Sequence, residues 1–129
     1  MIAGGKITYV KASREGGRPA GVKVSIELTG VSARGNGLEV GFAYLADYGV
    51  GALRMRGSIF TREESAERAA FLSAAFKEKR LPAEVFRELV DAVNRLCSAE
   101  GAFVVTPLEL APPMKPLSLR GMLANSRAG

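Results

Sequence analysis

The sequence predicts an α+β fold: a four-stranded antiparallel sheet, meander-like, with two or three helices packed on one face. Three observations lead to this prediction. The first half of the 129 residues alternates between apolar and polar with period two, the turns between the alternating runs are short, and the period becomes helical after Thr61. Because 47% of the residues are hydrophobic, we expect one domain spanning residues 1–129, with a frayed tail from about residue 123.

Four segments are expected to form strands. Residues 6–12 are rich in β-forming side chains, and apolar residues alternate with polar or small ones along 22–29, 38–45 and 53–60. The last three runs are separated only by a Gly-Asn-Gly turn and by a second glycine-rich turn. Short turns join antiparallel neighbours, so we expect the four strands to be paired in the order in which they occur along the chain.

Two helices are expected to follow the strands. Thr61-Arg-Glu-Glu64 has the pattern of a capping box and predicts a helix from there to about residue 80. Pro82 suits the first turn of a second amphipathic helix, and Gly101 suits its C-terminal cap. Prolines within residues 102–113 predict an extended segment after that helix.

The composition argues against an enzyme and against a bound cofactor or metal. The chain has no histidine, so it lacks the usual general base near neutral pH and the commonest metal ligand. Its one cysteine, Cys97, lies on the apolar stripe of the second predicted helix and is interpreted as a buried, unreactive thiol. Gly35-Asn-Gly37 and Gly49-Val-Gly51 do not continue as phosphate-binding loops.

A cytoplasmic location without membrane insertion is expected. No apolar run of about 18 residues is present, and the first residues do not have the character of a signal peptide. A single cysteine forms no internal disulfide, which agrees with a reducing compartment.

The charge of the chain is +5, with Lys+Arg 18 against Asp+Glu 13, and the excess lies in residues 1–60 and after residue 100. By strand parity, two arginines and an aromatic residue of the run at 53–60 share one sheet face. The same parity exposes the small residues Gly41 and Ala43 of the preceding run, which leave a low, flat surface. Such a surface can bind single-stranded nucleic acid by phosphate contacts and stacking. The candidate residues for this function are Lys23, Arg54, Arg56 and Phe60. Tyr9, Tyr44 and Tyr48 are further aromatic candidates for stacking.

A structural interpretation of the same residues stays open. Phe42 and Tyr44 can face the helices as part of the core. Arg54 and Arg56 can then pair with Glu27 and Glu39 across the strands.

Binding of unfolded polypeptide is the other class of function that the apolar and aromatic residues suggest. It requires apolar grooves that accept many sequences, and flexible segments with aromatic residues and methionine suit that task. The turn at residues 47–51 and the segment at residues 103–114 are the candidates. The residues proposed to contact a client are Tyr44, Tyr48, Phe60, Leu108, Leu110 and Met114.

The order and spacing of the segments resemble those of the bacterial protein-export chaperone family SecB. Gly57-Ser-Ile-Phe60 lies where that family has a strand-ending motif, and Leu108-Glu-Leu-Ala-Pro112 lies at its extended segment after the long helix. The resemblance covers about residues 5–122. It implies an ATP-independent holdase that assembles as a dimer or tetramer. The family is typically acidic, whereas this chain is basic, so the resemblance does not carry over contact with the export ATPase.

The sequence therefore favours a holdase that binds unfolded polypeptide in apolar grooves of a homo-oligomer. Its alternative is a single-stranded nucleic-acid-binding protein that uses the basic sheet surface.

Overall fold

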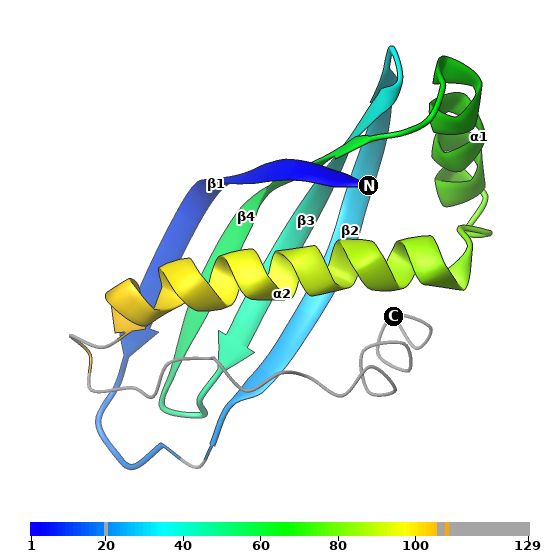
Figure 1. Ribbon diagram of the computed structural model, residues 1–129. Helices are drawn as coiled ribbons and strands as arrows, with labels where there is room; N and C mark the ends of the chain where they lie inside the picture. The colour runs from blue at the N-terminus through cyan, green and yellow to red at the C-terminus, as the bar shows by residue number, and fades with distance from the viewer. Residues whose placement is uncertain (20, 106–107, 109–129) are drawn as a thin grey trace.

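The computed structural model describes residues 1–19, 21–105 and 108. Four strands come first and two helices follow, as Figure 1 shows. The elements are β1 (Ile2–Arg14), β2 (Lys23–Arg34), β3 (Gly37–Asp47), β4 (Gly51–Arg62), α1 (Ala66–Lys77) and α2 (Ala83–Val105). The predicted α+β class and the four-stranded antiparallel sheet are confirmed.

The strand order of the sheet is β1-β4-β3-β2, and every pair is antiparallel. Strands β2, β3 and β4 form the expected meander. Strand β1, however, lies beside β4 and not beside β2, so its position differs from the sequential order. The connection between β1 and β2 is longer than a hairpin turn, which allows the chain to pass to the opposite edge of the sheet (Figure 1).

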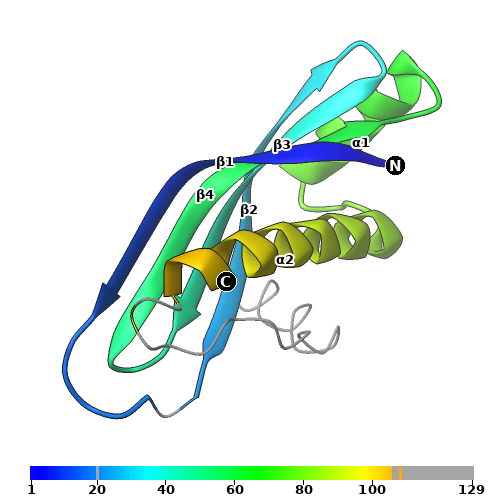
Figure 2. The ribbon, with the colours of Figure 1, turned by 60° about the vertical axis from the view of Figure 1, so that its left-hand side comes forward.

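The core lies between one face of the sheet and the two helices. Helix α2 crosses this face diagonally, and α1 packs near β2 and β3 (Figures 1 and 2). Every strand residue in the core cluster points to this side, which we call the inner face. Its buried members from β2, β3 and β4 are Val24, Leu38, Val40, Phe42, Tyr44, Ala46, Leu53, Met55 and Ile59.

Helix α1 begins later than its predicted capping box. Thr61 belongs to β4, where it pairs with Leu38, and its buried hydroxyl accepts a hydrogen bond from the Leu38 N–H at 3.3 Å. Ser65 caps the helix instead, because its Oγ accepts a hydrogen bond from the Arg68 N–H at 3.1 Å. The prediction of a capping box at Thr61 is therefore wrong, because pairing with β1 and β3 extends β4 through Thr61 and Arg62.

Helix α2 is longer than predicted. Gly101 is buried inside the helix and does not cap it, because the four-residue spacing of Leu89, Val93, Cys97 and Gly101 continues to the buried Val105. The start of the segment predicted to be extended is therefore helical. Of the rest of that segment, only residue 108 is described. Within the described ranges, neither helix has the length and apolarity needed to cross a membrane.

Candidate functional site

The sheet face opposite the core carries no helix in the described part of the chain. We call it the outer face. Strand register places a band of cations on it, together with fewer acids. The cations are Lys6, Lys11, Lys23, Arg34, Arg54, Arg56 and Arg62, and the acids are Glu27, Glu39 and Asp47.

The cations concentrate on the half of the outer face formed by β1 and β4. Lys11 lies opposite Arg54, and Tyr9 lies opposite Arg56. A bulge between Ile7 and Tyr9 inserts one residue into β1, so Ile7 faces the core while Tyr9 points outward. The three acids of the outer face come from β2 and β3, and the β1–β4 half therefore has cationic side chains without an acidic neighbour from its own two strands.

Two aromatic rings lie within this cationic half, and each is covered by a cation. The Arg56 guanidinium carbon lies 5.3 Å from the centroid of the Tyr9 ring, and the Lys6 ammonium nitrogen lies 5.6 Å from that of Phe60. Tyr9 is 41% exposed, which is high for a large aromatic side chain. The surface thus offers both positive charge and planar apolar groups to a ligand.

Cross-strand ion pairs do not neutralise the two arginines. Arg54 faces Leu45 and Arg56 faces Ala43 on β3, so neither stands directly opposite a glutamate. Among the residues that the structure describes, ion pairs join the N-terminal amine to Glu63 and Arg80 to Glu78. The interpretation that pairs Arg54 and Arg56 with Glu27 and Glu39 is therefore wrong.

The fourth predicted cation, Lys23, lies apart from the others. It begins β2 at the far edge of the sheet, shares the outer face and stands opposite Asp47. The structure thus brings Arg54, Arg56 and Phe60 together and leaves Lys23 beside an acid, two strands from β4. Tyr9, one of the aromatic candidates of the sequence, lies on the same surface. Lys6 and Lys11 also belong to it but were not predicted as site residues, because the bulge in β1 breaks the parity on which the prediction depends.

Two of the residues predicted to bind a client are part of the core. Tyr44 and Tyr48 are each 2% exposed, because Tyr44 points to the inner face and Tyr48 folds under the turn after β3. Neither side chain lines a surface groove of this chain, and the prediction for both is corrected. Leu108 packs partly buried against the core, whereas Leu110 and Met114 lie outside the described residues.

Among the residues that the structure describes, the buried Tyr44 hydroxyl has no hydrogen-bond partner of good geometry. Burial raises its pKa well above the usual value of 10, the nearby Cys97 adds to the rise, and Ser98 partly offsets it. Burial also raises the pKa of the Cys97 thiol to about 12, so the thiol stays neutral and unreactive at physiological pH. Within the described ranges, no cluster of three or more acidic or sulfur ligands is placed to hold a metal ion.

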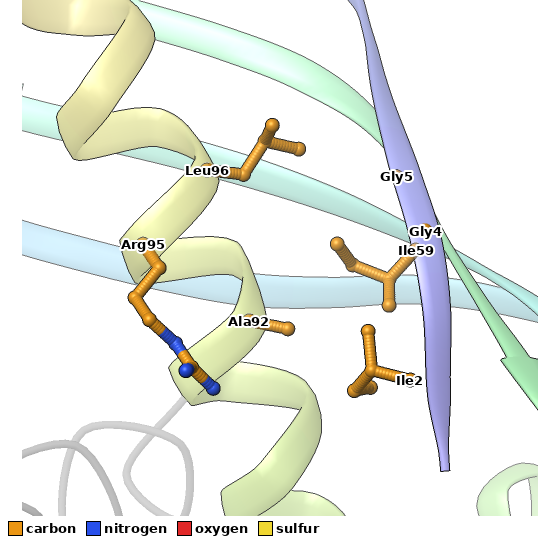
Figure 3. A pocket seen from close by; sticks show the side chains of 7 residues that line it. All are labelled: Ile2, Gly4, Gly5, Ile59, Ala92, Arg95 and Leu96. Atoms are coloured by element: carbon orange, nitrogen blue, oxygen red, sulfur yellow. The ribbon is translucent and has the colours of Figure 1, made fainter.

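A shallow apolar pocket of about 310 Å³ lies on the helical side of the molecule, between β1 and α2 (Figure 3). Ala92, Arg95 and Leu96 come from the helix, and Ile2, Ile59 and the Gly4–Gly5 backbone come from the sheet. Figure 3 shows the aliphatic side chains converging, with the Arg95 guanidinium along the helix beside them. The pocket is large enough for an apolar side chain of a partner and is separate from the outer face.

Comparison of the chain with models of protein families, with curated proteins and with solved structures found no match.

Proposed function

We propose that this protein binds single-stranded nucleic acid along the outer face of the β1–β4 pair. The observation that carries the proposal is the grouping of Lys6, Lys11, Arg54 and Arg56 around the rings of Tyr9 and Phe60 on a sheet face that no described helix covers. Cations contact phosphates, and exposed rings stack with bases that are not paired.

The flatness of the surface supports an extended ligand. Ala43 on β3 lies beside Arg56, and Gly41 lies beside Ser58, so small side chains border the cationic strand. Leu45 borders Arg54 and Glu39 borders Phe60, so the small side chains lie along the middle of the strand. The acids on β2 and β3 repel phosphates, so they confine a bound polyanion to the β1–β4 half of the outer face.

Fluorescence anisotropy of a labelled oligonucleotide at 50 and 300 mM salt tests this function. Four phosphate contacts predict a fall in affinity of roughly 100-fold between the two salt concentrations. Arg54→Glu with Arg56→Glu should reduce affinity at 50 mM salt by at least about tenfold. The matched control is Lys77→Glu with Arg87→Glu, which makes the same charge change on exposed helical residues of the other side. Equal losses in both double variants would contradict a site on the outer face.

We also propose a second function, the ATP-independent holding of unfolded polypeptide, which the resemblance to SecB implies. The observation that favours it is apolar surface on the helical side. Phe103 is 80% exposed, Phe71 is 56% exposed, and the pocket between β1 and α2 offers an apolar hollow. An exposed ring that becomes buried against a client contributes roughly 1.5–3 kcal/mol.

Suppression of the aggregation of a heat-denatured client enzyme tests this second function. Phe71→Ser with Phe103→Ser should weaken the suppression, whereas the Arg54/Arg56 double variant should retain it. Loss of suppression in the Arg54/Arg56 double variant, with suppression retained in the Phe71/Phe103 double variant, would show that the client is bound through charge. The assay thus separates the two functions with the same set of proteins.

A homo-oligomer in the cytoplasm belongs to this second proposal. Strands β1 and β2 are the two edges of the sheet, and 13 residues of β1 are available to pair with a second copy. Light scattering after size-exclusion chromatography should give a mass of two or four chains. A monomeric mass at micromolar concentration would contradict the proposed assembly.

A further inference from the structure

The two rings of the outer face, the exposed Tyr9 and the half-buried Phe60, are each covered by a neighbouring cation. Arg56 covers the face of Tyr9, and Lys6 covers that of Phe60, each at a distance typical of a cation–ring contact. At an exposed site such a contact favours the covered state by only a few-fold, whereas a stacked base contributes about tenfold or more. A base can therefore replace the cation at each ring.

The spacing of the rings fits one strand of nucleic acid. Tyr9 lies opposite Arg56 and Phe60 lies opposite Gly4, so the rings are separated by four residues along β4 and by one strand across the sheet. Four residues of a strand cover about 13 Å. Bases lie at least about 3.4 Å apart along one strand, so at most about four nucleotide steps separate the two rings.

We propose that two unpaired bases of one strand stack on Tyr9 and Phe60 and displace Arg56 and Lys6, which then contact the phosphates between the bases. This inference rests on the proposed nucleic-acid function and specifies its ligand: an unpaired run of about five nucleotides or fewer, recognised without base-edge hydrogen bonds. Tyr9 and Lys6 lie on β1, whereas Arg56 and Phe60 lie on β4. Each ring on which a base would stack therefore has beside it, on the other strand, a cation that can contact a phosphate.

A paired duplex does not satisfy this arrangement, because its bases are stacked on one another and present only their edges in the grooves. A duplex can still contact the lysines and arginines through its phosphates. Removal of a ring should therefore affect single strands and duplexes differently, and that difference separates stacking from attraction by charge alone.

The test is the affinity of the wild type, Tyr9→Ala and Tyr9→Phe for a labelled pentanucleotide and for a blunt-ended duplex of two fully annealed strands, measured at the same salt concentration. We expect Tyr9→Ala to lower the affinity for the single strand about tenfold and to change the affinity for the duplex less than twofold. Tyr9→Phe keeps the ring and should retain the affinity of the wild type within twofold. Phe60→Leu should reproduce the single-strand loss, since it keeps apolar volume without a ring.

A fluorescence measurement tests the same contact directly. The chain contains no tryptophan, so Tyr9→Trp introduces a single reporter on the outer face. A stacked base should quench its emission as the pentanucleotide is added, and the duplex should leave the emission unchanged. Quenching by both ligands, or by neither when both bind, would overturn the stacking inference.

The outcomes distinguish this inference from the function on which it rests. If the wild type binds single strands with the expected salt dependence but Tyr9→Ala binds equally well, stacking is wrong and the charge-driven function stands. If the wild type binds neither ligand at 50 mM salt, the proposed function itself is wrong, and the stacking inference with it.

Discussion

The ring of Phe42 lies across from Gly57 and fills the space that a side chain at that position would need. A Cβ on Gly57 would come within 2.9 Å of the Phe42 Cζ and would also clash with the carbonyl oxygen of Lys6. The close approach of β1 to β4 thus requires a residue without a side chain at this point of the sheet.

Gly57→Ala should therefore destabilise the protein by about 1–3 kcal/mol, because the β1 backbone at Lys6 must move away and the Phe42 ring must shift as well. Urea unfolding followed by circular dichroism measures the loss. Gly30→Ala is the matched control, since a Cβ at Gly30 meets nothing within 4 Å and its stability should change by less than about 0.5 kcal/mol. Equal effects at both glycines would show that strand glycines in general, and not this contact, set the cost.

Ser65→Ala should cost about 1 kcal/mol of unfolding free energy, because the Arg68 N–H loses its acceptor at the start of α1. Glu64→Gln should have almost no effect, since the capping box predicted for Thr61 and Glu64 does not form. The same urea experiment compares the two variants. A larger loss for Glu64→Gln than for Ser65→Ala would restore the capping-box prediction.

Tyr44→Phe should leave the stability unchanged or raise it by up to about 2 kcal/mol. The variant removes a buried hydroxyl for which the described residues offer no hydrogen-bond partner of good geometry, Ser98 included, and it keeps the ring in the core. Thermal unfolding monitored by circular dichroism would detect the gain. Tyr9→Phe serves as a control, because that ring is exposed. Clear destabilisation by Tyr44→Phe would show that the hydroxyl is satisfied in solution.

Stability should fall as the pH rises above about 9. The pKa of the Cys97 thiol is raised from 9.0 to about 12 in the folded chain, so the unfolded chain loses this proton first. Between pH 9 and pH 12 the folded state therefore keeps a proton that the unfolded state has lost. One thiol with this difference lowers the free energy of unfolding by roughly 1 kcal/mol for each unit of pH. The buried Tyr44, with its raised pKa, adds to the slope above pH 10.

Urea midpoints at pH 8, 9.5 and 10.5 measure this slope, and Cys97→Ala isolates the thiol. The variant is expected to be less stable at pH 8, because it leaves a small cavity, but its stability should fall less steeply with pH. Parallel pH profiles for the variant and the wild type would refute the role of the thiol.

The sequence predicted the parts of the fold that depend on local periodicity. Alternation along residues 38–45 and 53–60 correctly assigned Phe42 to the core and Arg54 and Arg56 to one shared face. The position of β1 could not be predicted in this way, because alternation within a strand does not specify which strand edge it pairs with. Local signals also failed at Thr61, where strand pairing on both sides prevails over a capping pattern.

The candidate site was predicted in part for a related reason. Arg54, Arg56 and Phe60 follow simple parity along β4. Tyr9 was a candidate only as an aromatic residue, and Lys6 and Lys11 were not candidates, because these residues lie on either side of a bulge that sequence periodicity does not reveal. Tyr48 was assigned to a binding loop because it lies in a glycine-rich turn, yet the turn folds its ring into the core.

The bulge between Ile7 and Tyr9 also determines which mutations the outer face tolerates. Substitutions along β1 change one side chain at a time, but pairing of Thr8 as an ordinary strand residue, without the bulge, would shift the alternation of every residue after it. Tyr9 and Lys11 would then turn toward the hydrophobic core, and Val10 would take a place among the arginines. Deletion of Thr8 would instead keep Tyr9 and Lys11 on the outer face, because Tyr9 would follow the inward-facing Ile7 directly. The assignment of side chains to the two faces of this strand therefore depends on one extra residue.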